Sequence, residues 1–332
     1  MADKKIEHVV IIVKENHTFD NYFGRFPGAN GDSKLATAPN PPHADQSHTH
    51  EAWLQFNTKA VRQQYDAQTM QPYWELAKTF TLCDNYFTDV AGPSTPNHLM
   101  LITGDSPVID NIHASSKKDA KAPAVTYTLD SLPKHLEKAG LTWKNYGGYA
   151  FEYVRALKSS PNTVPSEHFV KDARAGNLPT VSWLYAGEST QLYGDLSEHP
   201  PANITPGMEW TMQQIQAVVD GGLWGKTAIF ITWDDWGGWY DHVTPPQIET
   251  WQDGTQFRYG PRVPCLVVSP YAKRAYISHT LHSHVSLLAF CEKNFGLPAI
   301  TKRDKEASDM SDCFDFTQTP LQPPQVGATP SA

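Results

Sequence analysis

The chain has 332 residues, of which 40% are hydrophobic and 19% charged, and its formal net charge is −8. This is enough apolar material for one large core, and no Gly/Ser linker divides the chain, which favours a single domain over two. The negative charge argues against a duplex nucleic-acid binder, which carries a basic face. No run of about 20 apolar residues is present for a membrane span. We therefore expect no nucleic-acid partner and no integral membrane segment.

The first 17 residues, MADKKIEHVVIIVKENH, pass from a short charged lead into an apolar run that ends at Lys14. This run is too short and too quickly charged for a signal peptide, so the sequence as written is expected to be cytoplasmic. The tail 317–332 is rich in proline and is expected to be flexible. Residues 1–316 are then left as one folded domain.

Short apolar runs predict buried strands, and amphipathic patterns between them predict helices. Strands are expected at 9–13, 180–185, 227–232 and 263–269, with a weaker signal at 141–146. Helices are expected at 72–80, 96–102, 129–139, 208–219 and 283–295. This alternation predicts an α/β fold with a mostly parallel central sheet covered on both faces. The polar stretch 28–71 is expected to lie over the sheet edge, and 159–178 to be loop-rich.

The cysteines are widely scattered and show no CxxC or zinc-ribbon spacing. They are Cys83, Cys265, Cys291 and Cys313. Four buried thiols are the simplest interpretation. One or two disulfides are the alternative if the protein is exported.

Polar clusters follow two of the predicted strands. Glu15 and Asn16 follow the first strand, and Asp234 and Asp235 follow the strand at 227–232. Sites in open α/β sheets lie outside the carboxyl ends of the strands, so these clusters are expected to face each other. Adjacent carboxylates repel unless a cation lies between them, and oxygen ligands suit divalent metals. A solvated acidic turn and an ordinary helix cap are the structural alternatives.

The run AGPSTPNH at 91–98 predicts a strand-to-helix turn, with Ser94 at the N-cap and Pro96 in the first turn. A hydroxyl at a helix N-terminus lies beside free N–H groups that bind phosphate oxygens. A nearby metal would lower its pKa and activate it as a nucleophile. The alternative is that Ser94 is only a cap, and Thr95 is the rival hydroxyl.

Several histidines lie near these motifs. Asp195 and His199 have the Asp-x-x-x-His spacing that can place two ligands on one metal, although a surface loop can show it too. In the His-rich loop, one residue could protonate a leaving group; the candidates are His43, His48 and His50.

The acidic pair is followed by DHV and surrounded by aromatic residues. Asp241 is expected to orient the His242 imidazole as a supporting pair. The aromatics are expected to be core and rim, or else a wall for a quaternary ammonium head group. They are Trp233, Trp236, Trp239 and Tyr240.

Four long segments together resemble a known family. They are VVIIVKENHTFDNYFG, YWELAKTFTLCDNYFTDVAGPSTPNHLMLITG, ITWDDWGGWYDHVTPP and GPRVPCLVVSPYAKRAYISHT. In this order they resemble the bacterial phosphoesterase family of phosphatidylcholine-type phospholipases C and related acid phosphatases, in the alkaline phosphatase superfamily. The resemblance covers about 6–316. It implies an alkaline phosphatase-like α/β/α sandwich with 1–316 as the catalytic domain, and relatives that are often exported.

The resemblance also implies roles for individual residues. It implies one divalent metal (zinc, calcium, magnesium or manganese), held by Glu15, Asn16, Ser94, Asp234 and Asp235. Ser94 follows Gly-Pro, where the family has its nucleophile, and would form a phosphoserine intermediate. His199 or His48, the latter in a D-x-x-H pattern from Asp45, would protonate the leaving alcohol. Asn97 and His242 match substrate-binding positions of the family.

The chain departs from the family in two motifs. The family usually has Asp-Glu where this chain has Asp234-Asp235, which could alter the choice of metal. It has Asp-His where this chain has Ser283-His284, which puts a role for His284 in doubt. Asp195, His199 and His284 could supply a second metal site, but the single-metal pattern of the family favours one metal.

These features predict a metal-dependent phosphoester hydrolase, specifically a phospholipase C-like phosphodiesterase. The large phospholipases carry C-terminal domains that are not found here, so a small phosphoester competes with a phospholipid head group as substrate. An acid phosphatase-type phosphomonoesterase is the main alternative, and peripheral lipid contact is compatible with either. A metal-independent serine esterase is disfavoured because G-x-S-x-G is absent. The remaining alternative is a non-catalytic binder of phosphorylated or choline-bearing surfaces.

Overall fold

The computed structural model describes residues 5–112, 125–186 and 196–325. Within them, a central eight-stranded sheet has the order β13-β4-β12-β9-β1-β8-β6-β7. β1 pairs in parallel with β8 and β9, whereas β12 is antiparallel to β9 and β4. The strands are β1 (His8–Lys14), β4 (Thr81–Cys83), β6 (Trp143–Tyr146), β7 (Thr163–Val164), β8 (Val181–Tyr185), β9 (Thr227–Trp233), β12 (Cys265–Val268) and β13 (Tyr276–Ser278). The predicted mostly parallel sheet is confirmed.

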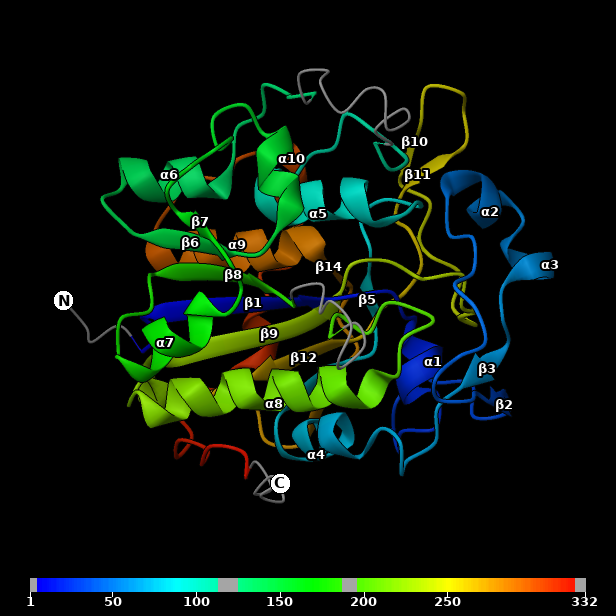
Figure 1. Cartoon of the computed structure of the whole chain (residues 1–332), viewed down its shortest axis with the longest axis horizontal. Helices are drawn as coiled ribbons and strands as arrows, with labels where there is room; N and C mark the ends of the chain where they lie inside the picture. The colour runs from blue at the N-terminus through cyan, green and yellow to red at the C-terminus, as the bar shows by residue number, and fades with distance from the viewer. Residues whose placement is uncertain (1–4, 113–124, 187–195, 326–332) are drawn as a thin grey trace.

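Helices cover both faces of this sheet (Figure 1). One face carries α4 (Gln71–Thr79), α7 (His168–Arg174) and α8 (Ile204–Asp220). The other carries α5 (Ser94–Thr103), α6 (Leu132–Lys138), α9 (His284–Phe295) and α10 (Lys302–Glu306). The α/β/α sandwich is therefore confirmed. The stretch 159–178, which was expected to be loop-rich, contains β7 and α7. The helix was not predicted because it is short and buries only Phe169 and Ala173, which is too few apolar residues to form a helical pattern.

The central strand β1 shows why the core forms here. Its residues 9–13 are all at most 1% exposed, because neighbouring strands flank it and helices cover both of its faces. A strand buried on both faces is a continuous apolar run rather than an alternating one, as in HVVIIVK. Beyond Lys14 the chain leaves the sheet and becomes polar.

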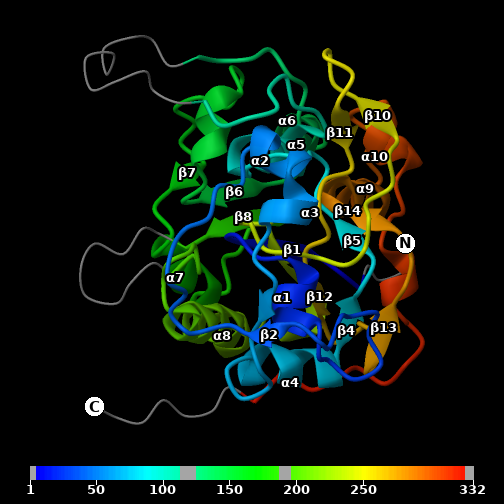
Figure 2. The ribbon, with the colours of Figure 1, turned by 90° about the vertical axis from the view of Figure 1, so that its right-hand side faces the viewer.

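The segment that follows β1 covers the carboxyl end of the sheet (Figure 2). It holds α1 (Phe19–Phe23), β2 (Ala36–Thr37), α2 (His50–Leu54), α3 (Phe56–Lys59) and β3 (Gln63–Gln64). The stretch 28–71 thus lies over the strand ends, where β1 points, rather than along a side edge. The other short elements are β5 (Tyr86–Phe87), η1 (Tyr149–Tyr153), η2 (Trp224–Lys226), β10 (Glu249–Thr250), β11 (Gln256–Arg258), β14 (His282–Ser283) and η3 (Ser311–Cys313).

The start of the C-terminal tail differs from the expectation of a flexible segment. Leu321 is 2% exposed, its N–H donates to the Pro270 carbonyl, and its carbonyl accepts from Trp224 Nε1. These contacts dock the described part of the tail on the domain, while 326–332 lie outside the described residues.

All four cysteines are buried free thiols, as the simplest interpretation held. No helix in the described ranges is long and apolar enough to cross a bilayer.

A carboxyl pair joins α9 to α10 and gives a pH-dependent stability. Burial and the neighbouring Asp304 carboxyl raise the pKa of Glu292 to about 9. The folded state therefore holds a proton that the unfolded state releases near its ordinary value of 4.5. Because the native state binds more protons, this contribution to stability is complete below that value and is lost as the pH rises toward 9.

We expect Glu292→Gln to remove this pH dependence, because the amide keeps a hydrogen-bond donor toward Asp304 at every pH. Urea unfolding midpoints at pH 5, 7 and 9 measure this dependence. As the pH rises, the midpoint of the variant should increase relative to that of the wild type. Glu306→Gln, at an exposed position on α10, is the matched control. A Glu292→Gln midpoint that tracks the wild type across this range would contradict the shared proton.

Candidate active site

The register of the central strands brings the two predicted acidic clusters together. Lys14 of β1 is the partner of Trp233 of β9, and the Asp234 N–H donates to the Lys14 carbonyl at 3.0 Å. Glu15 and Asp234 therefore leave the parallel sheet side by side. Ligand atoms of Glu15, Asp234 and His98 lie within 4.8 Å of one another. The meeting of the clusters expected from the sequence is present in the structure.

Ser94 is the first residue of α5, and its side chain lies beside this cluster. The N-cap is Pro93, so the prediction of Ser94 as N-cap is wrong by one position. The Ser94 hydroxyl is not used to cap the helix. It donates to Asp235 Oδ2 at 3.0 Å instead, and Ser94 is 7% exposed. The hydroxyl thus faces the acidic pair from within a nearly closed site.

The rival hydroxyl is placed differently. Thr95 Oγ1 is 3.1 Å from the Tyr149 hydroxyl, and the Thr95 N–H donates to Asn111 Oδ1 at 2.8 Å. Pro96 has no N–H to offer. The start of α5 therefore has fewer free N–H groups for phosphate oxygens than its position alone suggested.

Asn97 fixes the loop that presents Ser94. Its Oδ1 accepts from the Val90 N–H at 2.9 Å, and its Nδ2 donates to the carbonyls of Val90, Gly92 and Pro93. These bonds tie the start of α5 to the preceding turn. Asn97 as a substrate ligand stays a prediction.

The acidic pair is fully buried, which has electrostatic consequences. Burial, and then the charge of Asp234, raises the pKa of Asp235 well above its usual range. Burial would also raise the pKa of Asp234, but the His98 ring, whose Nε2 lies 3.0 Å from Asp234 Oδ2, lowers it on balance. Two adjacent carboxylates in a low-dielectric site are costly unless a positive charge offsets them.

The donor set fits a divalent cation. Asn16 is fully buried, and its Oδ1 has no hydrogen-bond partner among the described residues. A buried acceptor without a partner calls for an explanation, and beside the acidic pair a bound cation supplies one. Gly237 lets the turn after the acidic pair approach Asn16, since a Cβ there would lie 2.1 Å from the Asn16 carbonyl oxygen. Amide, carboxylate and hydroxyl oxygens around this point suit a hard or borderline metal.

His48 and His199 lie together at this site, with ring centroids 5.9 Å apart. His48 Nδ1 is 2.7 Å from the Gln46 carbonyl, which can only accept, so Nδ1 carries the hydrogen. The other ring nitrogen, Nε2, lies 3.3 Å from Asn16 Nδ2, which can donate to it. His48 also lies with Nε2 4.0 Å from Asp235 Oδ2.

His199 is better placed to carry a proton. Its Nδ1 is 2.6 Å from the Pro200 carbonyl, which again fixes the hydrogen on Nδ1. Burial disfavours the charged ring, but the Glu15 carboxylate and the Pro200 carbonyl outweigh it and raise the pKa of His199. Its partner in the predicted Asp-x-x-x-His motif, Asp195, lies outside the described residues.

A buried ion pair holds the backbone that carries His199. Glu198 and Lys14 are both fully buried, with Glu198 Oε1 3.2 Å from Lys14 Nζ. Glu198 also accepts from the hydroxyls of Tyr22 and Tyr73 at 2.8 and 2.6 Å and from Trp233 Nε1 at 3.2 Å. The sequence analysis did not predict this ion pair, because Lys14 and Glu198 are far apart in the chain.

His284 supports the site from α9. One ring nitrogen, Nε2, lies 2.9 Å from the Asp234 carbonyl, and the other, Nδ1, lies 3.1 Å from the Tyr86 hydroxyl. With both nitrogens engaged, His284 is not placed to ligate a second metal. This contradicts the three-residue second site that the sequence left open.

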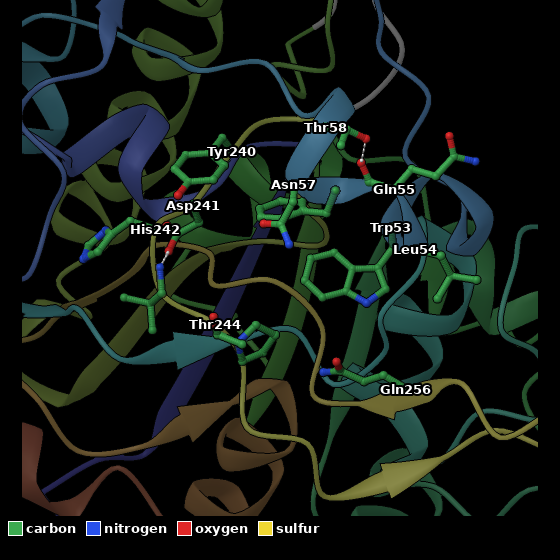
Figure 3. A pocket seen from close by; sticks show the side chains of 13 residues that line it. Trp53, Leu54, Gln55, Asn57, Thr58, Tyr240, Asp241, His242, Thr244 and Gln256 are labelled. Atoms are coloured by element: carbon green, nitrogen blue, oxygen red, sulfur yellow. Dashed lines mark hydrogen bonds between the residues drawn. The ribbon is translucent and has the colours of Figure 1, made fainter.

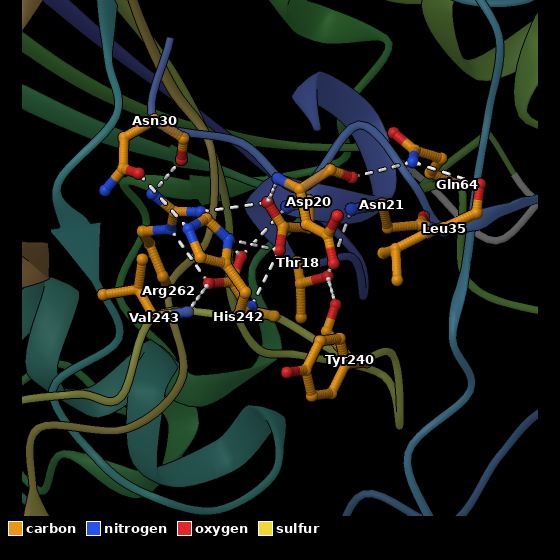
Figure 4. A network of polar contacts seen from close by, with 12 residues as sticks. Thr18, Asp20, Asn21, Asn30, Leu35, Gln64, Tyr240, His242, Val243 and Arg262 are labelled. Carbon is orange, nitrogen blue, oxygen red and sulfur yellow. Dashed lines mark hydrogen bonds and ion pairs between the residues drawn. The ribbon is translucent and has the colours of Figure 1, made fainter. Parts of the chain in front are cut away.

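His242 belongs to a separate buried network (Figure 4). Its Nδ1 is 2.7 Å from Asp20 Oδ2, whereas Asp241 Oδ1 accepts from Arg262 Nε at 3.0 Å. The expectation that Asp241 orients His242 is therefore wrong, because the Asp241 carboxylate turns inward to the buried guanidinium. Burial raises the pKa of Asp241 to about 6, although Arg262 opposes the shift.

We expect Arg262→Met to lower the free energy of unfolding by about 3–5 kcal/mol, since it leaves Asp20 and Asp241 buried without their cation. Denaturant unfolding measures this. Arg274→Met, at an exposed position, is the control and should stay within about 0.5 kcal/mol. A loss under about 1 kcal/mol for Arg262→Met would show that the pair of aspartates does not depend on the guanidinium.

His242 also lines a cavity of about 490 Å³ with Trp53, Tyr240 and Gln256 (Figure 3). Ser94 is not among the residues lining this cavity, so His242 as a substrate ligand stays a prediction. Trp236 connects the two regions: it packs on Trp53, and its Nε1 donates to the His48 carbonyl at 3.0 Å.

The aromatic residues around the acidic pair are mainly core. Trp233, Trp236 and Trp239 are at most 2% exposed, which confirms the core interpretation for these three. Only Tyr240 of the four lines the cavity. The tryptophans therefore position the site rather than present a wall to solvent.

His98 is a site residue that the sequence analysis did not assign. It lies four residues after Ser94 on α5, which places both side chains on one face of the helix. This four-residue spacing is the feature of the sequence from which His98 could have been predicted as a site residue. His98 is fully buried and stacks on Tyr185, with ring centroids 5.2 Å apart. It is therefore placed to orient Asp234 or to help hold a cation at the acidic pair.

We expect His98→Gln to weaken metal binding and activity about 10–100-fold, the range found when a supporting partner of a metal ligand is removed. Metal titration followed by activity at each metal concentration measures it. The control is His168→Gln, at an exposed position at the start of α7. Unchanged metal affinity in His98→Gln would remove His98 from the site.

The sandwich, with an oxygen-rich site at the carboxyl ends of its strands, has the alkaline phosphatase-like architecture. Murine ectonucleotide pyrophosphatase/phosphodiesterase 5 is similar in fold, with a TM-score of 0.55 and 10% identity over 93% of this chain and 100% of that chain. A putative sulfatase from Bacteroides thetaiotaomicron has a TM-score of 0.51 and 12% identity, over 90% and 72%. The fold predicted from the sequence is confirmed.

The chain belongs to the Phosphoesterase family, whose model matches residues 6–43 and 39–298. It is 27% identical to a non-hemolytic phospholipase C of Pseudomonas aeruginosa, over 99% of this chain and 60% of that protein. It is 26% identical to phospholipase C B of Mycobacterium tuberculosis, over 98% and 82%. The family resemblance is thus confirmed, and the chain spans less than two thirds of the Pseudomonas relative.

Proposed function

We propose that this protein hydrolyses phosphodiesters in the manner of a phospholipase C, with Ser94 as the nucleophile beside one divalent metal. The observation that carries the proposal is the Ser94 hydroxyl, which lies 3.0 Å from Asp235 in a pocket of oxygen donors. The buried Asn16 Oδ1, which has no hydrogen-bond partner among the described residues, supports a cation there. The phospholipase C relatives favour a phospholipid head group as substrate.

The proposed ligands are Glu15, Asn16, Ser94, Asp234 and Asp235. When bound, the metal would offset the carboxylate charges, lower the pKa of the serine hydroxyl and attract phosphoryl oxygens. The protein's own contribution is positioning. Asp235 holds the Ser94 hydroxyl through a hydrogen bond, and Asn97 fixes the turn from which Ser94 projects. Such positioning and charge stabilisation supply most of the catalysis in phosphoryl transfer.

The proposed chemistry has two steps. Ser94 passes its hydroxyl proton to Asp235, the acceptor of its hydrogen bond, and its Oγ attacks phosphorus in line with the leaving alcohol, giving a phosphoserine. Water then gives a proton to His199 and displaces Ser94 from phosphorus, Ser94 recovers its proton from Asp235, and the phosphomonoester is released. His199 gives its Nε2 proton to the leaving alcohol, because its Nδ1 hydrogen is held by the Pro200 carbonyl. His48 is the less suitable acid, since its Nε2 lies 3.3 Å from the Asn16 amide nitrogen, which is itself a hydrogen donor.

A substrate panel with and without chelator tests the proposal. We expect p-nitrophenyl phosphocholine or bis-p-nitrophenyl phosphate to be cleaved faster than p-nitrophenyl phosphate. EDTA should abolish each activity, and a divalent metal should restore it. Preference for the monoester would instead assign a phosphomonoesterase. Full activity after chelation and metal analysis at zero equivalents would overturn the metal site.

A further inference from the structure

We propose that the protein has a second metal site, of the zinc type with sulfur ligands, on the side of β9 that faces away from β1. Its ligands are Cys83 at the end of β4, His282 of β14 and Cys313 of η3, three fully or nearly fully buried side chains from distant parts of the chain. Their ligand atoms all lie within 4.8 Å of one another. The site is independent of the proposed function.

The distances match tetrahedral coordination. Cys83 Sγ and Cys313 Sγ are 3.7 Å apart. Two thiolates on a tetrahedral zinc, each with a bond of ~2.3 Å, are held about 3.8 Å apart. Cys313 Sγ is 4.0 Å from His282 Nε2. A zinc-bound imidazole nitrogen and thiolate lie about 3.6 Å apart, so a small closure of this edge suffices.

A carboxylate completes the donor set. Asp312 Oδ1 lies 3.0 Å from His282 Nε2 and 3.8 Å from Cys313 Sγ. The Ser278 hydroxyl donates to the other Asp312 oxygen and so orients the carboxylate. The Asp312 side chain is 25% exposed, which gives an ion a path to the buried sulfurs. Asp312 is therefore placed to serve as the fourth ligand.

The contrast with Cys291 shows that this is not ordinary core packing. Cys291 is a buried thiol on α9 for which burial is the main cause of a raised pKa, as expected for a small apolar side chain. Cys83 and Cys313 face each other and an imidazole–carboxylate pair instead. Two thiols beside an imidazole and a carboxylate form the kind of donor set that binds zinc.

The bound metal would act as a structural clamp. It would join β4, the strand next to the edge strand β13, to the C-terminal turn η3 and to β14, which leads directly into α9. α9 begins with His284, whose ring lies 2.9 Å from the Asp234 carbonyl. Binding releases the two thiol protons, and two thiolates then balance the charge of a divalent ion. No electron transfer is involved.

Cobalt substitution of the full-length, metal-stripped protein under anaerobic conditions tests this site. Thiolate ligation gives a sulfur-to-cobalt charge-transfer band, which the oxygen ligands of the catalytic site cannot produce. We expect this band in the wild type and in the matched control Cys291→Ser. Cys83→Ser and Cys313→Ser should lose it together with one bound equivalent, while circular dichroism reports their fold.

Absence of the band from the folded wild type would overturn the proposal, whatever the variants do. Retention of the full band in the Cys83→Ser/Cys313→Ser double variant would do the same. A thiol count in denaturant gives a third readout. Four titratable thiols before reduction support the site, whereas two missing thiols would assign a Cys83–Cys313 disulfide in its place.

Discussion

Ser94→Ala is expected to lower turnover of a phosphodiester by at least ~10⁴-fold while the protein stays folded. The hydroxyl is the proposed attacking group, and it donates directly to Asp235 of the acidic pair. Loss of its single hydrogen bond to Asp235 should cost only about 1 kcal/mol of stability. Steady-state rates, with unfolding measured in parallel, check both expectations.

Thr95→Val is the matched control for this experiment. Thr95 lies next along α5, but its hydroxyl contacts Tyr149 rather than Asp235. Its removal should leave turnover within about 10-fold of the wild type, the size of a positioning effect. Activity that survives in Ser94→Ala and disappears in Thr95→Val would show that Thr95, and not Ser94, is the attacking hydroxyl.

Asp234→Asn is expected to remove the catalytic metal and activity together. Asp234 is fully buried between Glu15 and His98, and an amide there contributes no charge to hold a divalent ion. We expect one fewer bound equivalent and a fall in turnover of at least ~10³-fold. Metal analysis and rates measured on the same preparation check this.

Asp253→Asn, at an exposed position, serves as the control for a lost carboxylate and should change neither quantity. Retained metal with lost activity in Asp234→Asn would move Asp234 from ligand to a role in the chemistry alone. Full activity without metal would refute the proposed cage.

The strands that build the site were predictable because they are buried on both faces. The run 9–13 is apolar at every position, and its polar successors mark where the chain leaves the sheet. The three-residue strands β4 and β13 were not predicted, since so short a segment has no periodicity to detect. The helix α7 was missed for a related reason, because it buries only Phe169 and Ala173.

Within the site, local motifs were visible and long-range partners were not. Gly-Pro before Ser94 and the acidic doublet after a strand are features of adjacent residues. The Lys14–Glu198 pair and the Asp20–Arg262 contact join residues far apart in the chain, and charge pattern alone cannot pair them. Asp241 shows the same limit. Its position next to His242 in the sequence suggested a contact with that ring, but its carboxylate accepts from the buried Arg262 guanidinium instead.

The stereochemical course at phosphorus tests the central claim most directly. A phosphodiester made chiral at phosphorus with oxygen isotopes or sulfur is hydrolysed in isotopically labelled water, and the configuration of the product is read. Attack by Ser94 followed by attack by water comprises two in-line displacements, so the account predicts net retention. Net inversion would show that water attacks the substrate directly, and would contradict Ser94 as the nucleophile.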